Sequence, residues 1–233
     1  MKFRVIDTRN KQYELISAAE IDKILALVFD RPLKSLDFEK VNRRRWFRST
    51  KPDIREIFSI LPMKGAWYSP AWGFSLDYVP HISGQKIRWH RTNKSALFDF
   101  RYDPLDYESP EEFGFKSWRI DSFYGKSTAI KQAKRVSKIS INAAKILWNS
   151  VQSLSDITMV FEEQLRLTQE RKVNRFGFYN YVQHPMAYAF TLAKIGETDS
   201  ALELLEKGTR EGLPTYKFAD DLRQRLFILA ENN

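Results

Sequence analysis

The hydrophobic pattern of this chain changes its period twice, and this limits the fold more than any other feature. Between about Ser17 and Phe29, apolar residues recur every three or four positions, as on the buried face of a helix. From Trp72 to Val79, aromatic and aliphatic residues alternate with small or polar ones, which is typical of a strand. The helical period returns from about Thr128. A helix, then strands, then helices predict an α+β fold.

Several short segments predict strands that are joined by tight turns. The residues from Leu36 to Arg48 favour a hairpin, and strand-like runs follow at 54–61, 72–79, 87–90 and 97–102. Strands that follow one another through short turns indicate an antiparallel sheet with one face covered. We therefore expect four or five antiparallel strands packed by helices. Ser17, with Glu20 three residues later, is the predicted N-cap of the first helix.

The C-terminal part of the chain is expected to be helical. Residues 128–151 carry an apolar stripe that predicts one long helix over the sheet. Residues 185–208 predict two helices folded back on each other at Gly196, and this pair resembles half of a tetratricopeptide-type array. Since one pair is evident, we expect a single terminal hairpin. Residues 1–172 are predicted to form the sheet domain and 173–233 a helical subdomain, or both parts form one domain.

Composition excludes several classes of site and location. The 233 residues include no cysteine, which removes disulfides, thiolate metal sites and cysteine nucleophiles. Apolar runs stay well short of the length of a membrane-spanning helix, and the first residues lack the apolar core of a secretory signal. We expect a cytoplasmic protein with no membrane contact.

The net charge of +9 is unevenly distributed along the chain. One group of cations, the arginine block, adjoins two aromatic residues in the predicted hairpin and consists of Arg43, Arg44, Arg45 and Arg48. A second group, the lysine stripe, falls on one face of the predicted long helix and consists of Lys131, Lys134, Lys138 and Lys145. Both are candidate interaction surfaces for nucleic acid or an acidic protein. A solvated helix face and a hairpin turn beside core aromatics give the same pattern.

Catalytic and cofactor signals are weak in this sequence. The three histidines have no metal-ligand spacing, and we find no glycine-rich phosphate loop and no nucleophile elbow. The acidic residues from Asp103 to Glu112 do not follow an EF-hand pattern. We expect no metal, no cofactor and no catalytic residue. An enzyme that uses His90 with Asp77 or Asp99 is a third possibility.

The residues Leu33 to Lys40, followed by Arg45-Trp46-Phe47-Arg48, resemble a family of bacterial proteins called domain of unknown function 4304. That family opens with a helix, then a leucine-lysine-x-leucine-glycine-phenylalanine-lysine-lysine turn, then an aromatic strand that ends in arginine. Asp37 stands at the position of the family's glycine. The resemblance covers about the first half of the chain, implies a bacterial protein and brings no catalytic residue with it.

These observations lead to an expected function. We expect a non-enzymatic bacterial protein that works by binding another protein, with toxin-neutralising immunity proteins as one class of this kind. The alternative is a nucleic-acid-binding protein that uses the two basic groups as one continuous surface.

Overall fold

The computed structural model describes residues 14–83, 85–89, 91–104, 118–170, 184–210 and 218–231. The chain forms two compact units. Unit 1 comprises Met1–Arg48, Ile57–Trp72 and Tyr102–Ile146, and unit 2 comprises Ser49–Glu56, Gly73–Arg101 and Leu147–Asn233. The expected boundary at residue 172 lies outside the described residues and stays a prediction.

The predicted α+β architecture is confirmed. The helices are α1 (Ala18–Lys34), α3 (Gly125–Ser150), α4 (Leu154–Gln169), α6 (His184–Lys194), α7 (Thr198–Arg210) and α8 (Ala219–Glu231), with a short 3₁₀ helix η1 (Asn93–Ser95). The main sheet contains β1 (Glu39–Asn42), β2 (Arg45–Lys51), β3 (Ile54–Met63), β4 (Trp67–Leu76), β7 (Phe100–Tyr102) and β8 (Ile120–Asp121). A separate hairpin consists of β5 (His81–Ser83) and β6 (Lys86–Arg88).

The main sheet is antiparallel and has the strand order β1-β2-β3-β4-β7, with β8 paired to β4. Counting β8, it has six strands, which is one more than the upper limit predicted. The reason is that β8 has only two residues, too few to produce an alternating pattern. The predicted hairpin between residues 36 and 48 is confirmed, because β1 and β2 pair in antiparallel register.

In unit 1, α1 packs on the sheet through aromatic side chains. Phe29 of α1 lies 6.0 Å from the ring of Trp46 and 5.7 Å from that of Phe58. Trp72 stacks on Phe58 at 6.4 Å and on Tyr102 at 4.8 Å, so the aromatic row continues across neighbouring strands. Each such pair adds about 0.5–1.5 kcal/mol beyond the burial of area.

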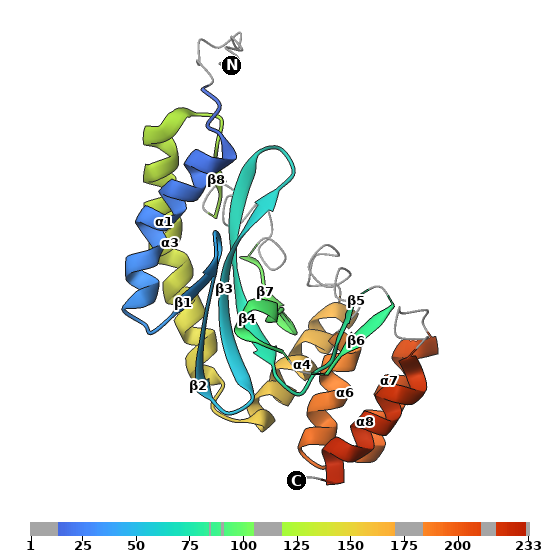
Figure 1. Ribbon diagram of the computed structural model, residues 1–233. Coiled ribbons are helices and arrows are strands. Elements are labelled where there is room, and N and C mark those ends of the chain that lie inside the picture. The colour runs from blue at the N-terminus through green and yellow to red at the C-terminus, as the bar shows by residue number, and fades with distance from the viewer. Residues whose placement is uncertain are drawn as a thin grey trace. The chain divides into compact units, whose positions relative to one another are not determined.

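The first helix begins where the sequence predicts, because the Ser17 side chain accepts a hydrogen bond from the Glu20 N–H at 3.2 Å. Figure 1 shows α1 and α3 on the same side of the strands of unit 1. Lys126, in the first turn of α3, donates to the Glu20 carboxylate at 2.5 Å, so the first turns of the two helices are in contact. These two helices therefore form one helical layer.

The turn after α1 has a backbone conformation that few residues adopt. Asp37 has a φ of +63°, in the left-handed region that favours glycine and that aspartate tolerates. This is the position at which the domain of unknown function 4304 family has glycine. The turn lets the chain reverse from α1 into β1.

Unit 2 is built around a second aromatic row. Phe100 lies 6.3 Å from Phe74 and 6.5 Å from Phe161, and Phe161 stacks on Tyr188 at 5.4 Å, which connects the sheet residues of this unit to α4 and α6. The helical hairpin is confirmed: α6 and α7 pack together, and Gly196 forms the turn between them with a φ of +89°. The third helix α8 packs against both.

Candidate interaction surface

All eight predicted interaction residues belong to unit 1. The arginine block lies at the β1–β2 hairpin, and the lysine stripe lies on α3. The two groups differ in their exposure to solvent and in their contacts within the fold. The first is largely engaged inside the fold, whereas the second is exposed.

Two members of the arginine block stabilise the fold itself. The Arg44 Nε donates to the Asp22 Oδ1 of α1 at 2.5 Å, and its guanidinium lies 4.7 Å from the centre of the Tyr68 ring. Arg48 donates to the Leu36 carbonyl at 2.8 Å and lies 4.9 Å from the centre of the Phe38 ring. Because their donors and faces are occupied, these two arginines are poorly placed to contact a partner.

The other residues of the hairpin also argue against base stacking there. Trp46 is 1% exposed and Phe47 is 6% exposed, so neither ring is available to a nucleic-acid base. Arg45 is half-buried, and only Arg43 has a largely exposed side chain, which lies 3.7 Å from the Asp22 carboxylate. The arginine block therefore contributes one exposed cation.

The lysine stripe has the opposite character. Lys131, Lys134, Lys138 and Lys145 are all exposed, and their ammonium groups form no ion pair or hydrogen bond within the part of the chain that the structure describes. The opposite side of α3 is buried and consists of Ala129, Ala133, Val136, Ser137, Ser140, Ile141 and Ala144. The predicted apolar stripe is confirmed at its positions 133, 137, 141 and 144, and this fixes the lysines on the solvent side.

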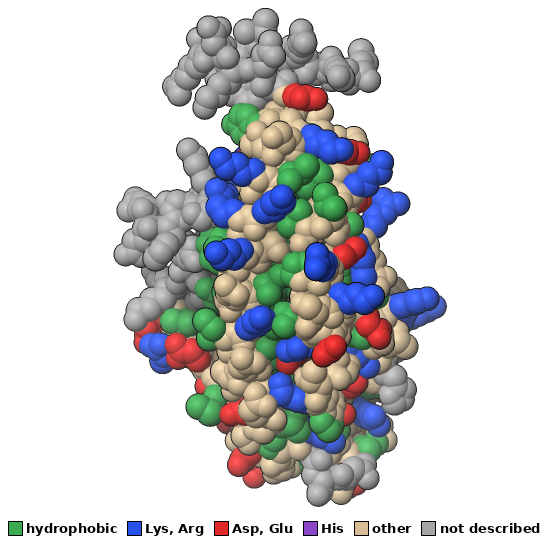
Figure 2. All heavy atoms as spheres, turned by 90° about the vertical axis from the view of Figure 1, so that its left-hand side faces the viewer, with side chains coloured by type: hydrophobic (Ala, Val, Ile, Leu, Met, Phe, Trp, Pro, Cys, Tyr) green, Lys and Arg blue, Asp and Glu red, His purple; other side chains and the backbone are tan. Residues whose placement is uncertain are grey.

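Apolar side chains also reach solvent on the same helical layer. Ile146 of α3 is 75% exposed and Leu27 of α1 is 71% exposed, while Ile139 is half-buried. Figure 2 shows this side of the molecule, where hydrophobic side chains lie between Lys and Arg side chains in the upper half and acidic side chains are more frequent in the lower half. We name this the basic helix face and define it as the lysine stripe with Lys23, Leu27, Ile139 and Ile146.

The acidic residues that α1 brings to this region already have cationic partners. Glu20 is paired with Lys126, and the hydrogen bond from Lys126 lowers the pKa of the Glu20 carboxyl. Asp22 is paired with Arg44, and Asp30 accepts from Lys40 at 2.8 Å and from the Trp46 indole at 3.0 Å. These carboxylates are thus poor competitors for a ligand of the lysine stripe.

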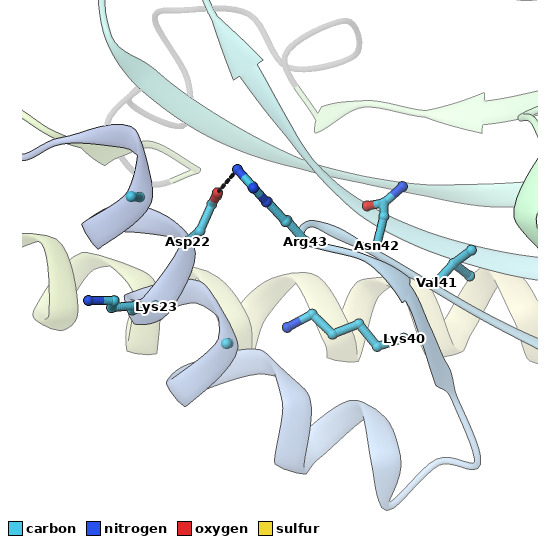
Figure 3. A pocket seen from close by; sticks show the side chains of 8 residues that line it. Asp22, Lys23, Lys40, Val41, Asn42 and Arg43 are labelled. Atoms are coloured by element: carbon cyan, nitrogen blue, oxygen red, sulfur yellow. Dashed lines mark ion pairs between the residues drawn. The ribbon is translucent and has the colours of Figure 1, made fainter.

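A groove lies between α1 and β1 and has a volume of about 510 Å³. Figure 3 shows Lys40 reaching from β1 toward α1, and Asp22 of α1 paired with Arg43. Strand β1 forms the edge of the sheet, but it has four residues and a register shift between Lys40 and Asn42. Short, charged and irregular edges resist pairing with an added strand. The groove is therefore a weak site for an extended peptide.

The two aspartates named for a possible enzyme both have ion-pair partners. Asp99 is fully buried and paired with Arg91, and Asp77 is paired with Arg55. Burial raises the pKa of the Asp77 carboxyl, although Arg55 opposes this. His90 lies outside the described residues. Among those that are described, no three histidine or acidic side chains come together as metal ligands.

The α6–α7 hairpin exposes little surface on α6. From Met186 to Ala193 every residue of α6 is buried, so α6 is enclosed on all sides. Only α7 has an exposed side, which includes Asp199, Glu203 and Lys207. The hydroxyl groups of Tyr78 and Thr191 form a buried hydrogen bond of 3.0 Å inside unit 2, as expected in a protein core.

Sequence reasoning missed the apolar members of the basic helix face. Leu27 and Ile146 are hydrophobic residues at positions that the buried stripes of α1 and α3 leave out. Their position outside the buried stripes was the only feature of the sequence that could have indicated their exposure. For the described helices, no segment has both the length and the apolar character needed to cross a membrane.

Comparison with known proteins adds no name to this description. No protein-family model matches the chain, and no curated protein and no solved structure gives a significant match. The resemblance to domain of unknown function 4304 therefore stays a prediction.

Proposed function

We propose that this is a non-enzymatic binding protein that docks a protein partner on the basic helix face. The observation that carries the proposal is the lysine stripe, four exposed ammonium groups without a partner in the described structure. A bacterial, cytoplasmic setting belongs to the same proposal, and a chain without cysteine is compatible with a reducing compartment. One class of partner within this proposal is a protein toxin that this protein neutralises by binding.

The charges of the lysine stripe repel one another. Lys131 and Lys134 are three residues apart, and Lys134 and Lys138 are four residues apart, so neighbouring ammonium groups repel each other. Like charges at these spacings cost about 0.2–0.5 kcal/mol per pair. The carboxylates of an acidic partner would attract these ammonium groups and so offset their mutual repulsion. The same attraction acts at long range and would increase the rate of association.

A protein partner fits this face better than nucleic acid does. Ile146 directly follows Lys145 and is 75% exposed, and Leu27 of α1 is 71% exposed. Burial of such apolar groups against a protein surface is favourable, whereas a phosphate backbone offers little apolar surface. Trp46 and Phe47, the aromatic residues that would stack bases, are buried. Nucleic-acid binding remains the second candidate, because the stripe lies in a segment, residues 122–155, that contains no acidic residue.

Co-purification from the native cells tests the proposal. The wild-type chain is compared with a stripe variant, K131Q/K134Q/K138Q/K145Q, and with a charge-matched control, K64Q/K86Q/K94Q/K207Q, in which four exposed lysines outside the basic helix face are changed. Each preparation is made with and without nuclease, and bound proteins are identified by mass spectrometry.

The proposal predicts one specific protein that survives nuclease, binds the wild type and the control, and is lost from the stripe variant. Recovery of nucleic acid alone, or loss of the signal on nuclease treatment, would support the second candidate instead. A protein that binds the stripe variant as strongly as the wild type would place the docking surface elsewhere and contradict the proposal.

A further inference from the structure

The lysines on α3 follow a regular spacing along the helix. Lys131, Lys138 and Lys145 are separated by seven residues each, which is close to two helical turns. At a rise of about 1.5 Å per residue, neighbouring lysines of this set lie about 10.5 Å apart along the axis, almost in a straight row. Lys134 lies beside this row and is also exposed.

A second row with the same spacing runs next to the first. Ile139 and Ile146 directly follow Lys138 and Lys145, and they are half-buried and 75% exposed, respectively. Lys138 and Lys145 thus each have an isoleucine on their flank at nearly the same height of the helix, whereas Lys131 is followed by Gln132. In helices that pack side by side, charged residues flank an apolar seam at seven-residue intervals, and α3 presents one such charged row beside a short apolar row.

We propose that α3 docks an acidic amphipathic helix, which places a carboxylate against each lysine of the row and apolar side chains against Ile139 and Ile146. This inference rests on the proposed function and specifies the chemistry of the partner. The lysines have no ion-pair partner among the described residues, so their charge complementarity with a row of Asp or Glu supplies attraction and fixes the register of the two helices.

Other polyanions match the row less well. An extended chain advances about 3.3 Å per residue, so about three residues span 10.5 Å and successive matched side chains point to opposite faces. The whole row is about 21 Å long, which corresponds to about six base pairs of duplex DNA. Over that length a DNA strand winds more than half a turn around the axis and departs from a straight row. A helix keeps the same spacing along its full length.

Titration with designed peptides tests the inference. The probe is a fluorescent helical peptide with Glu at every seventh position and Leu beside each Glu, and the control peptide has the same composition with the Glu residues at other spacings. Fluorescence anisotropy measures binding to the full chain, to K131Q/K138Q/K145Q and to the charge-matched K86Q/K94Q/K207Q, at about 50 mM and about 500 mM salt.

The expected result is that the wild type and the charge-matched variant bind the probe peptide, which has Glu at every seventh position, with equal affinity. The K131Q/K138Q/K145Q variant should bind the probe about tenfold more weakly, which corresponds to about 1.4 kcal/mol for three exposed charge pairs. The respaced peptide should bind the wild type more weakly than the probe, and high salt should reduce all of these differences.

Equal binding of the two peptides would overturn the inference, because spacing would then be irrelevant. Tighter binding of a short DNA duplex than of the probe, with the same dependence on the stripe, would also overturn it. A protein recovered by co-purification in a stripe-dependent manner would still support the proposed function if the peptide result were negative. The two failures are therefore distinguishable.

Discussion

The buried ion pair of Arg91 and Asp99 provides a sharp test of how unit 2 is held together. Both side chains have no exposed surface, and the two guanidinium nitrogens of Arg91 contact the two carboxylate oxygens of Asp99, one of them at 2.8 Å. Asp99 also accepts the Leu76 N–H at 2.7 Å, and Arg91 donates to the Pro80 carbonyl at 3.2 Å. The pair thus joins the end of β4 to the segment before β7.

Substitution of Asp99 by alanine should be far more damaging than its change in volume implies. It leaves a buried guanidinium without its counter-ion, which costs about 3–5 kcal/mol. The Leu76 N–H also loses its acceptor, at about 1–3 kcal/mol. The sum, about 4–8 kcal/mol, is comparable with the whole free energy of unfolding of many domains, about 5–15 kcal/mol.

The double variant R91M/D99L supplies the control. It removes both charges together, so the cost of the uncompensated guanidinium disappears, and what remains is the loss of the partners of neutral groups such as the Leu76 N–H and the Pro80 carbonyl. We expect the double variant to be more stable than D99A alone. Urea unfolding followed by circular dichroism gives the free energies from the transition midpoints and slopes. A D99A protein within about 1 kcal/mol of the wild type, or a double variant less stable than D99A, would refute this reasoning.

Three further predictions concern other parts of the fold. Gly73→Ala places a Cβ far closer to the Phe100 carbonyl oxygen than van der Waals contact, so we expect a loss of several kcal/mol of stability, seen as a large drop in Tm. An unchanged Tm would mean that β4 and β7 are not this close. Burial and the neighbouring Glu162 raise the pKa of Tyr188 to about 12, so the folded state keeps the phenol protonated and its contribution to stability falls as pH rises above about 10. In Tyr188→Phe that alkaline loss should shrink, as measured by urea unfolding at a series of pH values, and an identical pH profile would contradict the assignment. Hydrogen bonds from the Gln152 N–H and from Ser153 lower the pKa of Asp156 at the start of α4, so its stabilisation is present above about pH 4 and is lost as pH falls. The stability difference between the wild type and Asp156→Ala should therefore narrow in acid, and a difference that is constant down to pH 2 would exclude this role.

Local patterns were sufficient to predict most of the secondary structure. The apolar stripe of α3, the Ser17 cap of α1 and the Gly196 turn are all determined by residues close in sequence, and all were predicted correctly. The two-residue strand β8 was missed because it exists only through its pairing with β4. The alternation in β4 predicted one solvent face, yet all ten residues of that strand are buried.

The candidate surface was predictable only in part, because part of it depends on contacts between residues that are distant in the chain. The exposure of the lysine stripe follows from the helical period, whereas the engagement of the arginine block depends on residues distant in the chain. Arg44 contacts Asp22 and Tyr68, and Arg48 contacts Phe38, contacts that a reading of adjacent residues does not indicate. Two groups with similar charge in the sequence therefore have different roles in the structure.

Site-specific photo-crosslinking tests the central claim most directly, because it reports which surface a partner occupies in the cell. A photoreactive amino acid is introduced at Ile146, on the basic helix face, and in a separate chain at Met159, an equally accessible position on α4. We predict a covalent adduct with one protein at Ile146, resistant to nuclease and absent when the four stripe lysines are changed to glutamine, and no such adduct at Met159. An Ile146 adduct that contains nucleic acid, or equal adducts at both positions, would contradict the account.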